Sequence, residues 1–238
     1  MEEALEATIL LVVMVTFAMT AYAYVLPLSY GQLRAGEVRS AIGVMMVLSD
    51  QLAKLVEGDP TGPVDFSFPY GDFGLSDNGE VSVMVNGISL FNGSHRILRY
   101  RTDLGGYPLT FVADKGAIPQ AFFGGVDAAS LVYHYSSGGY TYVVSDMKVA
   151  VSNHTRGAVA FLHVLVTQIE VGQLALKRGP VQFTLDNRTV TTAVYNGSVS
   201  LVVQCGLASN GSPLTSSLQI ASGSVEISVE VVNVQVQG

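Results

Sequence analysis

An unbroken apolar segment dominates the hydrophobic pattern near the start of the chain. Residues 7–28 carry no formal charge, and as a helix they would be roughly 33 Å long at about 1.5 Å per residue. That length can cross a bilayer and exceeds the apolar region of a cleavable signal peptide, and no clear small-residue cleavage pattern follows it. The pattern therefore predicts one long apolar N-terminal helix.

A helical period continues beyond this segment with a different character. Pro27 cannot donate to the preceding turn, and nearby glycines weaken a helix, so we expect a kink or short gap near residues 27–36. Further on, the helix is amphipathic and should lie against a folded domain. Gly58-Asp59-Pro60 predicts its end. The expected apolar stripe consists of Ala41, Val44, Leu48, Leu52 and Leu55.

From Val64 onward the apolar period changes to two, which is typical of strands. Residues 80–85 and 225–231 alternate most clearly, and Gly-containing turn signals separate many short β-branched runs. The pattern predicts an α+β chain: a helix over residues 1–58 and an all-β, sandwich-like domain over residues 59–238. Two small sandwiches divided near Gly124-Gly125 are the alternative.

Acidic residues precede the apolar segment where a membrane anchor or secretory signal would carry basic ones. A helix that packs among copies of itself would place the chain's first residues in a low dielectric. A free α-amino group there needs a carboxylate partner, which Glu6, Glu3 or Glu2 could supply. An ordinary single-pass membrane anchor is the alternative interpretation of the same segment.

Residues 5–13, LEATILLVV, resemble the mature N-terminus of type IV pilins and archaellins, in which an acidic residue near the fifth position precedes about twenty apolar residues. The resemblance covers roughly the first 55 residues and implies a filament-forming helix with Glu6 in the role of that acid. The positions coincide if mature numbering starts at Glu2, and the expected leader is missing, so we interpret the sequence as a processed form. The assembly residues that we expect are Glu6, Glu3, Glu2, Leu10, Val13, Phe17 and Pro27.

Composition supports a protein that hides its surface. Only 13% of the residues are charged, about half the usual share, so membrane, neighbouring copies or glycans must cover apolar area. The net charge of −7 and the scattered basic residues argue against nucleic acid as a partner.

Asn-x-Ser/Thr triplets are frequent and lie beside predicted turns, where a glycan could reach solvent. Occupied sites would place the domain outside the cell, against the orientation that Arg34 and Arg39 would give by the positive-inside rule. The candidate glycosylation residues are Asn92, Asn153, Asn187, Asn196 and Asn210.

Signatures of catalysis are missing from the sequence: no nucleophile elbow, phosphate loop or dinucleotide fingerprint occurs. We expect no enzyme activity and no cofactor. Asp72, Asp77 and Asn78 are a weak Ca²⁺ candidate, for which a solvated turn is the preferred interpretation. The four histidines lie in separate segments, and the single cysteine, Cys205, lies in an apolar run that predicts a buried side chain.

These patterns together predict a structural subunit of an extracellular filament of the type IV pilus kind. It would be inserted in the membrane before assembly, would polymerise through its helix, and would serve adhesion rather than motility. The alternative is a membrane-anchored surface binding protein with an extracellular β domain.

Overall fold

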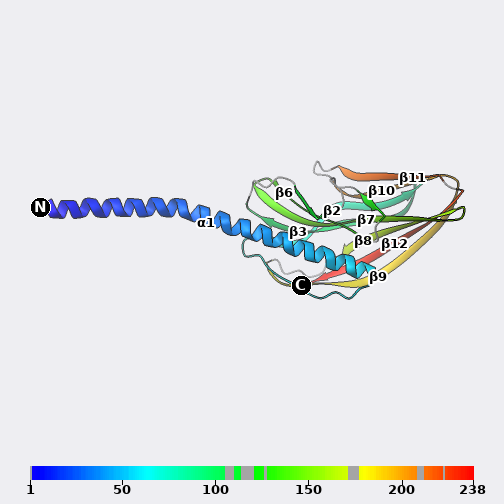
Figure 1. Cartoon of the computed structure of the whole chain (residues 1–238), viewed down its shortest axis with the longest axis horizontal. Helices are drawn as coiled ribbons and strands as arrows, with labels where there is room; N and C mark the ends of the chain where they lie inside the picture. Colours follow the sequence, from blue (N-terminus) through cyan, green and yellow to red (C-terminus); the bar gives the residue numbers. More distant parts are fainter. Residues whose placement is uncertain are drawn as a thin grey trace.

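The structure is a computed structural model that describes residues 2–104, 110–113, 121–125, 128–170, 177–207, 212–221 and 223–238. One helix, α1 (Glu2–Glu57), is followed by a β domain. Figure 1 shows that the first half of α1 projects away from the domain, whereas its second half lies along the sheet. The predicted α+β layout, a long apolar helix before an all-β region, is confirmed.

Helix α1 is continuous, so the gap expected near residues 27–36 is wrong. Pro27 lies inside the helix, where it removes one backbone hydrogen bond without ending the helical path. Figure 1 shows a gentle change of direction near the point where α1 reaches the domain. The exposed and packed halves therefore belong to one rod.

The second half of α1 is held against the sheet by one buried stripe. Its fully buried apolar residues are Val38, Ala41, Met45, Leu48, Leu52 and Val56. Three of the five predicted stripe residues are among them, whereas Val44 and Leu55 are partly buried at its margins. Burying each larger side chain contributes about 1.5–3 kcal/mol, so this half of the helix is part of the domain core.

The helix ends where the sequence predicts. Gly58 adopts φ +95°, a conformation that glycine reaches without steric cost. Its N–H donates to the Leu55 carbonyl at 3.1 Å, and the N–H of Asp59 donates to the Lys54 carbonyl at 2.8 Å. This pair of bonds is the Schellman motif, which satisfies the last carbonyls of the helix.

The strands form one curled, mixed sheet with the order β1-β9-β12-β8-β7-β3-β2-β10-β11. Off this path, β5 and β6 pair with β7, and β4 pairs with β6. Strands β12 and β8 pair in parallel, although most neighbours are antiparallel. Because hydrogen bonds link all the strands, the sandwich interpretation is not confirmed. The strands are β1 (Val64–Ser67), β2 (Asp72–Val85), β3 (Ile88–Thr102), β4 (Thr110–Ala113), β5 (Phe122–Gly124), β6 (Ala129–Ser137), β7 (Tyr140–Arg156), β8 (Val159–Glu170), β9 (Arg178–Asn196), β10 (Val199–Leu207), β11 (Pro213–Ile220) and β12 (Ser224–Gln237).

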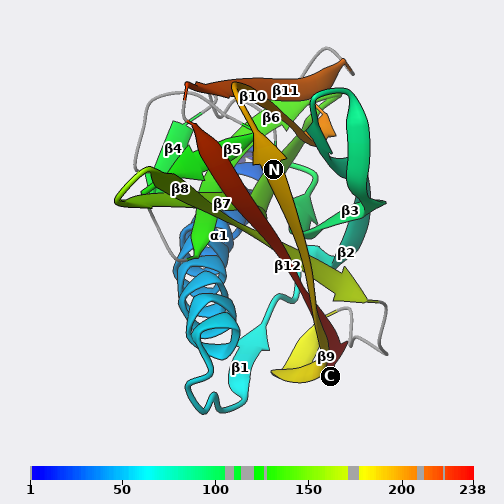
Figure 2. The ribbon, with the colours of Figure 1, turned by 90° about the vertical axis from the view of Figure 1, so that its right-hand side faces the viewer.

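Two apolar clusters lie on opposite sides of the central strands. The first lies between α1 and the sheet. The second lies inside the curl of the sheet, between β2 and β10 on one side and β7, β8 and β12 on the other. Figure 2 shows α1 on one side of β7 and β8, with β10 and β11 on the other. Strand β12 serves both clusters: Val225, Ile227, Val229 and Val231 belong to the second, and Val232, Val234 and Val236 belong to the first.

Turn chemistry explains three of the connections. Asn86 and Gly87, with φ 49° and 79°, join β2 to β3 as the predicted tight hairpin turn. The turns after Ser137 and Asn196 also lie where the sequence places them. The predicted turn at Asn92-Gly93 is wrong, because β3 passes through both residues.

Replacing a buried stripe residue tests how the helix is held. We expect Leu48→Ala to lower the free energy of unfolding by about 2–5 kcal/mol, because it leaves a cavity under the helix. The measurement is chemical denaturation of the full chain in detergent. Val47→Ala is the matched control, since Val47 is 47% exposed; an equal loss in the two variants would contradict the packing.

Candidate assembly surface and buried polar clusters

The projecting half of α1 exposes apolar side chains all round. Of the predicted assembly residues, Leu10, Val13 and Phe17 are 63%, 59% and 77% exposed, and Pro27 is exposed on the same half. The backbone of Glu2, Glu3 and Glu6 is helical, while their side chains lie outside the described residues. Such a surface far exceeds the apolar patch that a soluble monomer normally tolerates.

Two threonine hydroxyls on this half are satisfied within the helix. Thr16 donates to the Val12 carbonyl and Thr20 to the Thr16 carbonyl, each at 2.7 Å. No donor of these two threonines is therefore left for water, which suits apolar surroundings. By length and composition, α1 is the one described helix that could cross a membrane, and the mean hydropathy of its most apolar 18-residue window is 2.3.

A buried carboxylate joins the helix to the sheet. Glu37 is 7% exposed and accepts hydrogen bonds from the Gly71 N–H at 2.8 Å, the Tyr70 N–H at 2.9 Å and the Tyr100 hydroxyl at 3.0 Å. Burial, together with the carboxylate of Glu37, raises the pKa of Tyr100, which keeps its hydroxyl a donor. These three bonds fix where along its length α1 meets the domain.

A second polar cluster lies inside the β domain. Asp146 of β7 accepts from His95 and from the Lys148 ammonium, each at 2.7 Å, and all three residues are at most 2% exposed. The Cys205 sulfur lies 3.7 Å from His95 Nδ1. Cys205 is buried as predicted, and its sulfur is additionally a polar contact.

The charges in this cluster support one another. Burial alone would raise the pKa of Asp146, but Lys148 and His95 lower it to about 2. Burial alone would lower the pKa of His95, but Asp146 and Cys205 raise it to about 10. The arrangement is a buried ion network that joins β3 to β7, with Cys205 of β10 in contact with it.

A third cluster lies at the end of α1. Glu230 of β12 pairs with His163 at 2.8 Å and with Arg188 at 3.1 Å. Arg188 also donates to the Val56 carbonyl in the last turn of the helix. No sequence pattern predicts these pairs, because β8, β9 and β12 meet only in the folded sheet.

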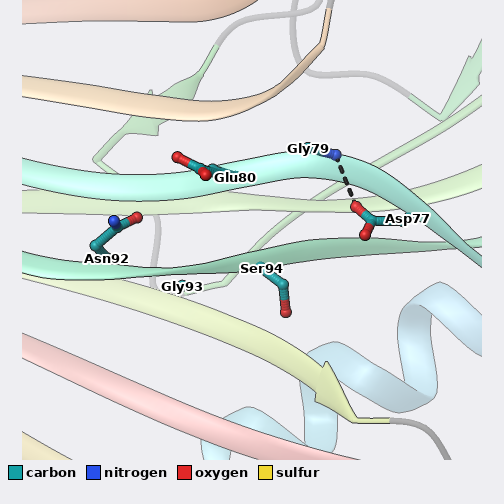
Figure 3. Close-up of a pocket in the computed structure, with 6 residues that line it drawn as sticks. All are labelled: Asp77, Gly79, Glu80, Asn92, Gly93 and Ser94. Carbon is teal, nitrogen blue, oxygen red and sulfur yellow. Dashed lines mark hydrogen bonds between the residues drawn. The ribbon is translucent and has the colours of Figure 1, made fainter.

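The weak Ca²⁺ candidate is dispersed in the structure. Asp72 pairs with Arg101 at 3.2 Å, and Asp77 accepts from the Gly79 N–H at 2.9 Å. Figure 3 shows this acceptor turned back toward Gly79 in a shallow pocket, while the Glu80 carboxylate points elsewhere. Within the described residues, no group of three or more His, Cys, Asp and Glu side chains is arranged to hold a metal.

The candidate glycosylation residues are accessible where the structure describes them. Asn92, Asn153, Asn187 and Asn196 are all exposed, although the first three lie within β3, β7 and β9 rather than in turns. Asn210 lies outside the described residues. Exposure leaves room for a glycan at each of the four.

Tyrosines of β6 and β7 form a cross-strand stack. The Tyr135 and Tyr142 rings lie 5.0 Å apart and Tyr133 and Tyr135 lie 6.1 Å apart, while Arg101 lies over Tyr140. Such aromatic pairs stabilise neighbouring strands.

Comparison with protein-family models, with curated proteins and with solved structures found no match for this chain.

The ion network predicts a pH dependence. The folded-state pKa of His95 is raised, so its stabilisation is present below its unfolded value of 6.5 and is lost as the pH rises through about 10. We expect the free energy of unfolding to fall across this window in chemical denaturation. His95→Gln should flatten that fall and His154→Gln, an exposed control on β7, should not; identical profiles would refute the assignment.

Proposed function

We propose that the chain is a structural subunit of an extracellular filament of the type IV pilus kind, polymerised through the first half of α1. The observation that carries the proposal is a helix of which one half is bare and apolar while the other is built into a folded domain. The resemblance of residues 5–13 to pilin N-termini agrees with it.

Assembly follows from the hydrophobic effect. In a bundle outside the membrane, the apolar side chains of residues 9–33 stay out of water, and each CH₂ kept from water contributes about 0.8 kcal/mol. The hydrogen bonds of Glu37 and the buried stripe hold the β domain against the second half of α1, next to the part that would enter the bundle. The curled sheet then forms a sandwich-like outer sheath around a helical core.

Glu6 would assist registration in this assembly. A carboxylate in the first turns of the helix can neutralise the α-amino group of a neighbouring chain, since an unpaired charge in an apolar core is costly. The chain would be inserted in the membrane before assembly, as its hydropathy allows. N-linked glycans on exposed asparagines such as Asn92 and Asn153 would cover the sheath, and adhesion is the role that we favour over motility.

The first test is electron cryo-microscopy of fibres sheared from source cells, with mass spectrometry to identify the subunit. Uniform fibres that contain this chain with α1 at the axis would support the proposal. If no fibre contains the chain, and the chain stays in the membrane fraction and dissolves in detergent, a membrane-anchored surface binding protein becomes the better interpretation.

A variant on the bare helix should separate assembly from folding. We expect Phe17→Lys to abolish fibres, because it would bury an unpaired charge between helices. Ile88→Lys is the matched control, since Ile88 is an apolar residue of the β domain that is 61% exposed. The measurement is a count of fibres at equal protein levels. A normal number of fibres from the Phe17 variant would contradict the proposal.

The acidic position has its own prediction. Glu6→Gln should reduce the number of fibres while the stability of the β domain stays unchanged, because only the pairing with a neighbouring amine is lost. Glu57→Gln, at the exposed far end of α1, serves as the control. Wild-type fibre numbers for Glu6→Gln would remove Glu6 from the mechanism without affecting the role of the apolar surface.

A further inference from the structure

Strand β9 has a long unpaired outer edge. On one side it pairs with β12 from residue 182 to residue 196. On the other side β1 covers only residues 178–181, and no other strand of the described residues pairs with β9. Backbone N–H and C=O groups along the remainder of that edge point away from the sheet, and Figure 1 shows β9 along the lower margin of the domain.

The middle of β9 is also poorly covered. Every residue from 185 to 192 is exposed, although the Arg188 side chain reaches the last turn of α1. Val190 and Val194 are 59% and 64% exposed, and their even positions place them on one face of the strand. An apolar ridge therefore runs directly beside the open edge.

Natural sheets usually protect such an edge with lysine, proline or a bulge. Protection is confined here to the first part of β9, where Pro180 lies opposite β1 and where Asp186 is an extra residue in the ladder with β12. Residues 189–195, TVTTAVY, contain no charge, proline or glycine. They are rich in strand-forming residues, the composition that favours pairing with another strand.

We propose that residues 189–195 of β9 pair antiparallel with the same residues of a second copy of this chain. In the register centred on Thr192, Val190 of each chain lies opposite Val194 of the other, so both exposed valines gain an apolar cross-strand neighbour. A slip of one residue would set outward-facing positions against inward-facing ones. The pleat and the two valines together select this register.

Charge also suits a second copy. No charged residue lies within the paired stretch, and Arg188 of each chain lies opposite Asn196 of the other, so like charges do not meet. The contact uses the same patch on both chains and closes after two. It is therefore separate from polymerisation through α1 and would join two domains, including domains from neighbouring filaments.

Disulfide trapping tests the pairing and its register. We would express the full chain with Thr192→Cys in a host that does not N-glycosylate. The purified protein is oxidised mildly in detergent, with more micelles than protein chains so that two chains rarely share a micelle by chance. A covalent dimer is expected, because Thr192 lies opposite its own copy. The native Cys205 is buried and adds little background. Ile88→Cys, at another exposed position of the β domain, controls for random collision within micelles.

Lysines on the edge should prevent the dimer. Adding Val190→Lys and Val194→Lys to the cysteine variant sets like charges opposite each other and should lower the dimer yield about tenfold. The pair Val190→Thr and Val194→Thr keeps the strand propensity and should lower it far less. Circular dichroism shows whether each variant is folded. A yield equal to that of Ile88→Cys, or one that the lysines leave unchanged, overturns the proposal, even if the chain self-associates by another route.

Discussion

The other parts of the molecule depend on one requirement: the apolar first half of α1 must be kept out of water. Its side chains are apolar on every side, and Thr16 and Thr20 satisfy their hydroxyls within the helix. A surface of this kind is unstable in water, so it must meet lipid or other protein. The fold confines this surface to the half of α1 that projects away from the β domain.

Polar groups then decide how the two parts are joined. Glu37 makes three hydrogen bonds across the junction, and Asp146 holds His95 and Lys148 inside the domain. Buried ion pairs add little net stability over apolar packing, but breaking one by removing a partner costs about 3–5 kcal/mol. Their value is positional, since apolar contacts alone would allow the helix and strands to slide.

Local patterns predicted much of this architecture from the sequence. The charge-free run over residues 7–28, the Gly58 stop and the Asn86-Gly87 turn each depend on nearby residues and were correct. The continuous helix through Pro27 was missed because the helix on either side outweighs one lost hydrogen bond. Partners such as His95 and Asp146 are 51 residues apart, and period alone cannot bring them together. One signal was available: Glu37 lies four residues before Ala41, on the buried stripe.

The continuity of α1 through Pro27 has a mechanical consequence. A pull along the axis of the projecting half reaches the domain through an unbroken rod. The buried stripe of the second half lies along that same direction, so the load is applied to all of its side chains together, in shear. A break at Pro27 would instead have concentrated the force on a short tether, and contacts would have peeled away one after another.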